Sequence, residues 1–379
     1  MSARTSSGPG ALTRVFGSQW FVSVLAVIIA FAIGAILIAL SGASVLDAYY
    51  AMFRGSIVDP NASTFVRQIK PLTDSLFYSI PLIISGLGLA LGFRAGLFNI
   101  GGKGQIIVGA LAAVWVGFAV NLPPVLHTLV ALLVAVIAGG LYAGIAGVLK
   151  AKTGANEVIV TIMLNSIATL GLGYTLAQKA WQVPGTNQPV TPKVAESAAL
   201  ARLLPAPFKL HVGFLVALVA LVAFWWLIER STLGFQIRAV GANAAAARTA
   251  GISVERITAI TMVLSGAFLG LAGANEALGT IGYVSRDVAG SIGFDAITVA
   301  LLGRNKTWGT FGAGLLFGAF KAGGYTMQAK GVPIDMILIL QSVIVLLIAA
   351  PALVRWLFRL PDVRALAANT RKGNADEHK

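Results

Sequence analysis

The amino-acid sequence predicts an all-α polytopic membrane protein with about ten transmembrane helices. Hydrophobic residues make up 57% of the 379 residues and charged residues only 11%, and the mean hydropathy is +0.84. Soluble domains are on average roughly 45–50% apolar and about 25% charged, so this chain has too few polar groups to cover a soluble surface. The composition therefore excludes an ordinary soluble enzyme and a disordered protein.

Apolar segments close to the ~20 residues that a helix needs to cross a bilayer follow one another along the chain. The first is longer than the apolar region of a signal peptide, roughly 7–15 residues, so we interpret it as a retained span. The eighth is the weakest, because Arg286, Asp287 and Asp295 interrupt it. The predicted spans are 20–40, 75–93, 105–120, 127–149, 158–178, 212–228, 257–277, 284–302, 309–327 and 336–354. The alternative is one span fewer or one more.

The distribution of basic residues predicts that both termini lie in the cytoplasm. When residues 1–19 are placed there and the loops alternate, the cytoplasmic segments contain 18 of the 28 Lys and Arg residues, as the positive-inside rule requires. The polar tail, 355–379, is then cytoplasmic as well. The net charge of +14 therefore reflects basic loops that face anionic lipid, and we expect no nucleic-acid partner.

Two long connections interrupt the predicted transmembrane domain, 20–354. Residues 179–211 are rich in proline and are predicted to form an external loop. Residues 229–256 are predicted to form a cytoplasmic loop, in which the alanine-rich stretch 243–248 favours a short helix. Within the spans, glycines recur at a spacing that lets helices approach closely in lipid. These glycines are Gly140 and Gly144, Gly266 and Gly270, and Gly314 and Gly318.

Motifs for catalysis and metal binding are absent from the sequence. The chain has no cysteine, and its histidines, His127, His211 and His378, are far apart, so we predict no metal site. The stretch 97–104 lacks the first glycine of a phosphate-binding loop and the Ser or Thr after the lysine. A hydrolase Gly-x-Ser-x-Gly turn is also missing. We therefore predict no catalytic residue, no cofactor and no ATP hydrolysis in this chain.

Polar residues inside the predicted spans are candidates for a substrate pathway, because polar groups in hydrocarbon are costly and often functional. Glu157, Thr161 and Asn165 are spaced four residues apart and share one helix face. The other candidates are Asn99, Gln105, Asn275, Glu276 and Asp295. Amide side chains offer paired hydrogen-bond donors and acceptors. The alternative is that these groups only form hydrogen bonds or charge pairs between helices.

Three segments carry a family resemblance. Residues 93–105 (FRAGLFNIGGKGQ), residues 154–165 (GANEVIVTIMLN) and residues 234–252 (GFQIRAVGAN…A…GI) resemble, in order, segments of ABC-transporter permeases for nucleosides and simple sugars. The resemblance runs from about Leu72 to Val354, and it favours the branch whose partner is a nucleoside-binding lipoprotein of the basic-membrane-protein type. Lys103 departs from the pattern, since relatives usually carry an acidic residue there.

This resemblance implies a type II ABC importer-like permease bundle in the bacterial cytoplasmic membrane, which moves nucleosides by alternating access. It implies a separate ATPase subunit that binds ATP and Mg²⁺, a second related permease subunit, and an external substrate-binding lipoprotein. The residues that it assigns to ATPase coupling are Arg238, Gly241, Asn243, Ala247, Gly251 and Ile252. We expect the permissive backbones of Gly241 and Gly251 to form tight turns at the two ends of the short helix.

Other functions are consistent with parts of the sequence. Within the family, ribose-like sugars and branched-chain amino acids are the alternative substrates. An ion-coupled secondary transporter would show inverted repeats, and the sequence contains no convincing internal repeat. A scaffold protein fits poorly with acidic and amide residues inside spans.

Overall fold

The structure is a computed structural model that describes residues 19–329, 331–333, 338–339, 342–343 and 346–347. The chain divides into two compact units, Met1–Ala51 with Met327–Lys379, and Met52–Thr326. Residues 1–18, most of the tenth predicted span and the predicted tail lie outside the described residues.

The regular elements of the described residues are all helices, as predicted, and an isolated β-bridge joins Arg202 and His211. The first unit contains α2 (Gln19–Leu40) and the start of α3 (Val45–Ser56). Here the Tyr49 hydroxyl donates a hydrogen bond to the Phe31 carbonyl oxygen, and the two rings meet edge to face.

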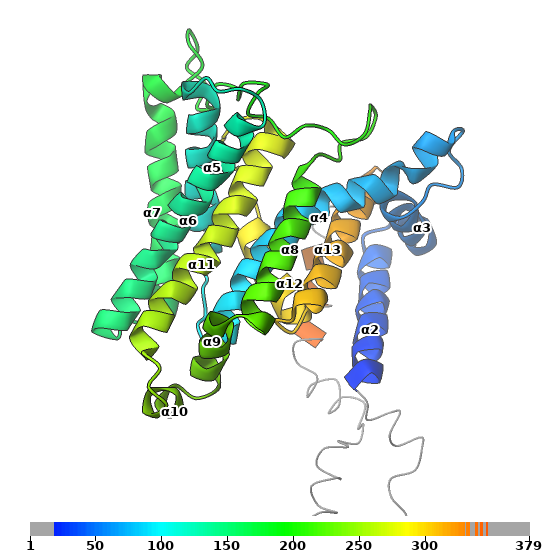
Figure 1. Ribbon diagram of the computed structural model, residues 1–379. Helices are drawn as coiled ribbons and strands as arrows, with labels where there is room; N and C mark the ends of the chain where they lie inside the picture. Colours follow the sequence, from blue (N-terminus) through cyan, green and yellow to red (C-terminus); the bar gives the residue numbers. More distant parts are fainter. Residues whose placement is uncertain (1–18, 330, 334–337, 340–341, 344–345, 348–379) are drawn as a thin grey trace, which may run out of the picture. The chain divides into compact units, whose positions relative to one another are not determined.

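The second unit is a helical bundle followed along the chain in Figure 1. Its elements are α4 (Phe65–Arg94), α5 (Gly102–Ala119), α6 (Leu126–Thr153), α7 (Glu157–Ala177), the short helix η1 (Lys179–Trp181), α8 (Gly213–Arg230), α9 (Thr232–Ala242), α10 (Ala244–Thr249), α11 (Val254–Asn275), a π-helical turn η2 (Glu276–Ile281), α12 (Ile292–Leu302) and α13 (Thr307–Gln328). Short-range capping fixes several starts: the side chains of Asn156, Asn243 and Ser253 accept backbone N–H groups at the first turns of α7, α10 and α11.

Six helices in the described part of the chain are long and apolar enough to cross a membrane: α4, α5, α6, α7, α8 and α11 continued by η2. Shorter apolar helices cover Val27–Leu40 and α12. On α6, the side chains of Leu129, Leu133, Ile137 and Leu141 repeat every four residues and are 51–66% exposed. An apolar face left uncovered along a whole helix is what contact with lipid requires.

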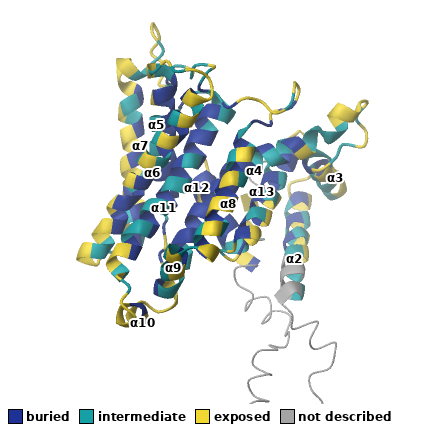
Figure 2. Ribbon diagram, in the orientation of Figure 1, coloured by how far each residue is buried: buried dark blue, intermediate teal, exposed yellow. Residues whose placement is uncertain are grey.

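The bundle interior lies where α11 packs against α4, α5 and α6, and buried residues gather there (Figure 2). A Cβ atom on Gly266 would lie 2.3 Å from the Gly139 carbonyl oxygen, and one on Gly270 would lie 2.3 Å from the Ala135 carbonyl oxygen. Because no side chain fits there, glycine allows the two helix backbones to touch. All three predicted glycine pairs lie at contacts with another helix, which confirms their packing role, although Gly144 faces only the Val263 side chain.

The eighth predicted span, 284–302, is wrong in its first half. Residues 282–291 form turns, and α12 begins only at Ile292. Gly282 and Gly290 have φ angles of +81° and +43°, and this backbone region interrupts a right-handed helix. The charged residues of this segment, Arg286 and Asp287, are exposed in these turns and are not buried in a span.

The two long connections lie at opposite ends of the second unit (Figure 1). The segment between η1 and α8 is at one end, and α9 and α10 are at the other. The predicted short helix over 243–248 is confirmed as α10. This arrangement is consistent with the two predicted loops facing opposite sides of a membrane.

Candidate functional site

The polar stripe of α7 binds the backbone between α4 and α5. Glu157, Thr161 and Asn165 accept hydrogen bonds from backbone N–H groups within residues 98–104, at 3.4, 3.3 and 2.8 Å respectively. Asn165 also donates to the Ile100 carbonyl oxygen at 2.8 Å. The stripe therefore faces the segment that joins α4 to α5.

These contacts describe the course of the glycine-rich stretch. Residues 95–101 are not helical. The backbone groups from Phe98 to Gly104 contact α7 from its first residue to its ninth, a distance of about 12 Å along the helix axis. The stretch thus enters the bundle from the α9 end and runs along α7 before α5 starts at Gly102. Side chains of α7 satisfy backbone groups that no regular helix would satisfy here.

Asn99 and Gln105 form a buried amide pair inside this region. Each amide nitrogen donates to the other residue's amide oxygen at 3.0 Å, and Asn99 also donates to the Ser265 hydroxyl on α11 at 3.0 Å. Both residues are 1% exposed. Asn99 and Gln105 therefore satisfy each other's hydrogen-bonding groups. Their place on a substrate pathway stays a prediction.

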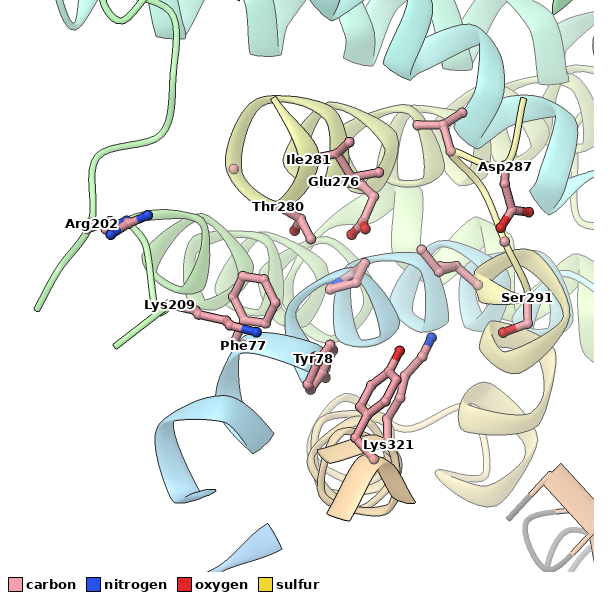
Figure 3. A pocket seen from close by; sticks show the side chains of 16 residues that line it. Phe77, Tyr78, Arg202, Lys209, Glu276, Thr280, Ile281, Asp287, Ser291 and Lys321 are labelled. Atoms are coloured by element: carbon pink, nitrogen blue, oxygen red, sulfur yellow. The ribbon is translucent and has the colours of Figure 1, made fainter. Parts of the chain in front are cut away.

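A cavity of about 570 Å³ lies elsewhere in the bundle, between α4, η2, the turns before α12, and α13 (Figure 3). Glu276 and Thr280 project into it from η2, and Lys321 projects from α13 on the opposite side. Its lining residues are Phe77, Tyr78, Pro81, Arg202, Lys209, Glu276, Gly279, Thr280, Ile281, Asp287, Val288, Gly290, Ser291, Ile292, Lys321 and Tyr325. The size falls within the roughly 300–1,000 Å³ range of small-molecule sites.

Charges of both signs line this cavity in near balance. The cations are Arg202, Lys209 and Lys321, and the anions are Glu276 and Asp287. The Glu276 and Lys321 side chains project into the cavity from opposite sides (Figure 3). A lining of this kind suits an uncharged solute with many hydrogen-bonding groups, since a phosphate ester calls for an excess of cations.

Of the eight predicted pathway residues, the structure brings one, Glu276, to the cavity lining. Asp295 lies just behind it and accepts a hydrogen bond from Ser291, which does line the cavity, at 2.6 Å. Asn275 lies beside His211 and donates to the Gly213 carbonyl oxygen at 3.3 Å. The other five form the cluster around residues 98–105 described above.

Aromatic side chains form one wall of the cavity. Tyr78 and Tyr325 have ring centroids 5.4 Å apart and ring planes tilted by 35°. Phe77 meets Tyr78 edge to face at 5.2 Å and His211 at 5.5 Å. These rings come from elements far apart in sequence, so no spacing pattern in the chain indicated them.

His211 is a buried histidine behind this wall. Its Nδ1 accepts a hydrogen bond from the Gly213 N–H at 3.1 Å, which leaves the proton on Nε2. Burial lowers the pKa of the His211 imidazole to about 4, so the ring is neutral at physiological pH. Among the residues that the structure describes, neither its Nε2 nor the Asn275 Oδ1 has a hydrogen-bond partner.

The predicted coupling segment has a defined geometry around α10. Asn243 caps this helix by accepting the Ala246 N–H at 3.0 Å. Gly251 follows it with a φ angle of +83°, so the expected turn at this glycine is confirmed. Gly241 differs from expectation: it lies inside α9 and is needed because a Cβ there would lie 2.0 Å from the Arg94 carbonyl oxygen.

An apolar groove of about 560 Å³ lies between α9 and α10. It is lined by the predicted coupling residues Asn243, Ala247 and Ile252 together with neighbours such as Phe235, which is 60% exposed. Arg238, the remaining coupling candidate, has a buried Nη1 atom that finds no hydrogen-bond partner in the described part of the chain. An open apolar groove at the end of a membrane bundle is a surface that a partner subunit can fill.

Comparisons with known proteins agree with this architecture. Residues 72–349 match the family described as branched-chain amino acid transport system / permease component. The chain is 40% identical to the guanosine ABC transporter permease protein NupP of Bacillus subtilis, over 89% of this chain and 95% of that protein. It is 36% identical to the glucose ABC transporter permease protein TsgB13 of Haloferax volcanii, over 85% of each chain.

A third relative is the nucleoside ABC transporter permease protein NupB of Lactococcus lactis, 31% identical over 92% of this chain and 95% of that protein. No solved structure matches the chain significantly. The family match covers most of the chain, including every helix from α5 to α13. The chain therefore belongs to this family of ABC transporter permeases and is a multi-pass membrane subunit, not an enzyme.

Proposed function

We propose that this chain is a permease subunit of an ABC importer that carries nucleosides across the bacterial cytoplasmic membrane. The observation that carries the proposal is the 40% identity to a guanosine permease along nearly its whole length. The near-neutral polar cavity with aromatic rings supports it, because a nucleoside is uncharged and has both hydroxyl groups and a flat base.

The arrangement in the membrane follows from the same proposal. Ten spans with both termini in the cytoplasm put the segment between η1 and α8 outside and α9–α10 inside. Arg202 and Lys209 then mark the external side of the cavity. An external binding protein would deliver substrate to this side.

The partner ATPase would dock on α9 and α10, in the groove beside Phe235 and Ala247. ATP and Mg²⁺ would be bound on that partner. Closure of the ATPase would push α9, and the contact of Gly241 with Arg94 would pass the movement to α4. Because α4 also carries Tyr78, the movement reaches the cavity wall.

A second, related permease chain would complete the membrane part. Two guanosine permease proteins of Bacillus subtilis, NupP and NupQ, are both similar to this chain, at 40% and 30% identity. That two such chains occur in one organism supports a pair of different permease subunits rather than two copies of one.

A sugar importer is the second candidate, because a glucose permease protein is 36% identical to this chain. Branched-chain amino acids are candidate substrates only because the family description names them. Uptake of labelled guanosine and adenosine by cells with and without this gene separates these functions. If the chain is part of a nucleoside importer, cells without the gene lose an ATP-dependent uptake that unlabelled nucleosides compete away in wild-type cells. Full competition by ribose or leucine contradicts the proposal, and so does uptake that an uncoupler abolishes but ATP depletion does not.

A further inference from the structure

A second cavity, of about 1,020 Å³, lies next to the first. Three residues line both cavities: Tyr78, Lys209 and Tyr325. The rest of the second cavity is strongly polar and includes the ion pairs of Arg54 with Asp59 and of Lys70 with Asp74. The two tyrosines and Lys209 therefore form a partition between two polar spaces.

The partition offers flat ring surfaces that the polar walls lack. Tyr325 is 45% exposed, and its ring lies at 35° to that of Tyr78. The other aromatic group of the first cavity, Phe77, is 6% exposed and is packed against Tyr78 and His211. A ligand with a π face thus finds its stacking surface at the tyrosine pair.

We propose that this tyrosine pair is the element that selects for the base of the substrate. The proposal rests on nucleoside transport, the function proposed above. A nucleoside passing between the cavities meets the partition, where its base stacks on Tyr78 or Tyr325. Its ribose hydroxyls then face the carboxylate and ammonium groups of Glu276 and Lys321.

The chemistry explains why the pair would discriminate between solutes. Stacking on an aromatic ring is worth roughly 1–3 kcal/mol per base, which corresponds to about a 5- to 150-fold change in affinity. Ribose alone has no base and gains nothing from this contact. Purines present a larger face than pyrimidines, so the pair should favour guanosine and adenosine over uridine.

The test measures equilibrium binding of tritiated guanosine and tritiated ribose to the assembled transporter in lipid nanodiscs, without the external binding protein. Tyr325→Leu and Tyr78→Leu should each weaken guanosine binding by about 5- to 150-fold. Tyr325→Phe, which keeps the ring, should restore most of what Tyr325→Leu loses. Tyr174→Leu is the matched control, because Tyr174 is 71% exposed on α7 and lines neither cavity.

A second measurement guards against a leucine variant that fails to assemble. The chain contains no cysteine, so Ser291→Cys places a unique thiol of similar size in the first cavity. Guanosine should protect this thiol from a methanethiosulfonate reagent, and the concentration needed for half-protection should rise when Tyr325→Leu is added.

The outcomes separate this inference from the function on which it rests. Guanosine binding that is unchanged in both leucine variants, or equal losses with Tyr325→Leu and Tyr325→Phe, would overturn the role of the tyrosine pair and leave nucleoside transport standing. A wild-type transporter that binds ribose but no nucleoside would contradict the function itself, and the role of the pair with it.

Discussion

Gly241 lies directly against the backbone of Arg94: a Cβ atom on this glycine would come within 2.0 Å of the Arg94 carbonyl oxygen. The contact joins α9, the helix before α10, to the last residue of α4. Arg94 is held in place from other sides, since its Nε donates to the Asn305 carbonyl oxygen at 2.8 Å. Movement of α9 cannot be absorbed by a flexible side chain here, because backbone meets backbone.

Replacing Gly241 should therefore separate ATP hydrolysis from transport. Gly241→Val forces α9 away from α4, so we expect the complex to hydrolyse ATP while nucleoside uptake falls at least tenfold, that is by about 1.4 kcal/mol or more in coupling. Uptake and ATPase activity are measured on the same membranes. Gly171→Val on α7 is the control, because nothing lies within 4 Å of a Cβ there; equal loss in both variants contradicts the prediction.

Gly251 tests the turn after α10 by another physical route. A Cβ at this position meets nothing within 4 Å, so the penalty of Gly251→Val is strain at φ +83°, about 1–2 kcal/mol. Asparagine tolerates this backbone region better than valine. We expect Gly251→Val to insert in the membrane but lose uptake, and Gly251→Asn to keep most of it. Normal uptake by Gly251→Val would remove the coupling role of this segment.

Asn165 distinguishes a structural role of the α7 stripe from a place on the substrate pathway. Asn165→Leu removes two hydrogen bonds to residues 100 and 104, so we expect a loss of about 1–2 kcal/mol in the free energy of unfolding. Thermal unfolding in detergent measures it, with Thr169→Val one turn away as the control. If stability stays at the wild-type value while substrate affinity drops, the side chain belongs to the pathway instead.

The buried His211 predicts a loss of stability in mild acid. Its pKa is about 4 in the folded chain and about 6.5 in the unfolded chain, so only the unfolded chain takes up the proton between these values. The free energy of unfolding should fall by about 3 kcal/mol as pH drops from 6.5 to 4, and level off below. In the His211→Gln variant, the free energy of unfolding, measured with urea or by heating, should change little between pH 6.5 and 4. An unchanged pH dependence in the variant would assign the acid sensitivity to another group.

Local features were predictable from the sequence where neighbouring residues determine them. The shared helix face of Glu157, Thr161 and Asn165 follows from their spacing, and all three residues contact the backbone within residues 98–104. Helix propensity made α10 predictable as well, because residues 244–247 are all alanine. In the structure Asn243 caps its start and Gly251 forms the turn that follows it. The role of Gly241 was misjudged because its partner, Arg94, is far away along the chain.

The cavity could be predicted only in part. Glu276 was a candidate because a carboxylate near the end of a span is costly, and it does line the cavity. Tyr78 and Tyr325 gave no signal, because aromatic residues are common in membrane helices and their pairing depends on how α4 and α13 pack. The turns over 282–291 were not predicted, because apolar residues flank Gly282 and Gly290 and made the segment resemble part of a span.

Transport by the purified parts tests the central claim most directly. Proteoliposomes that contain this chain, its ATPase and its second permease subunit, supplied with binding protein and with ATP on the ATPase side, should accumulate tritiated guanosine. Omitting this chain should abolish the signal, and excess unlabelled adenosine, but not ribose or leucine, should suppress it. ATP-dependent accumulation of ribose or leucine with no accumulation of guanosine would contradict the account.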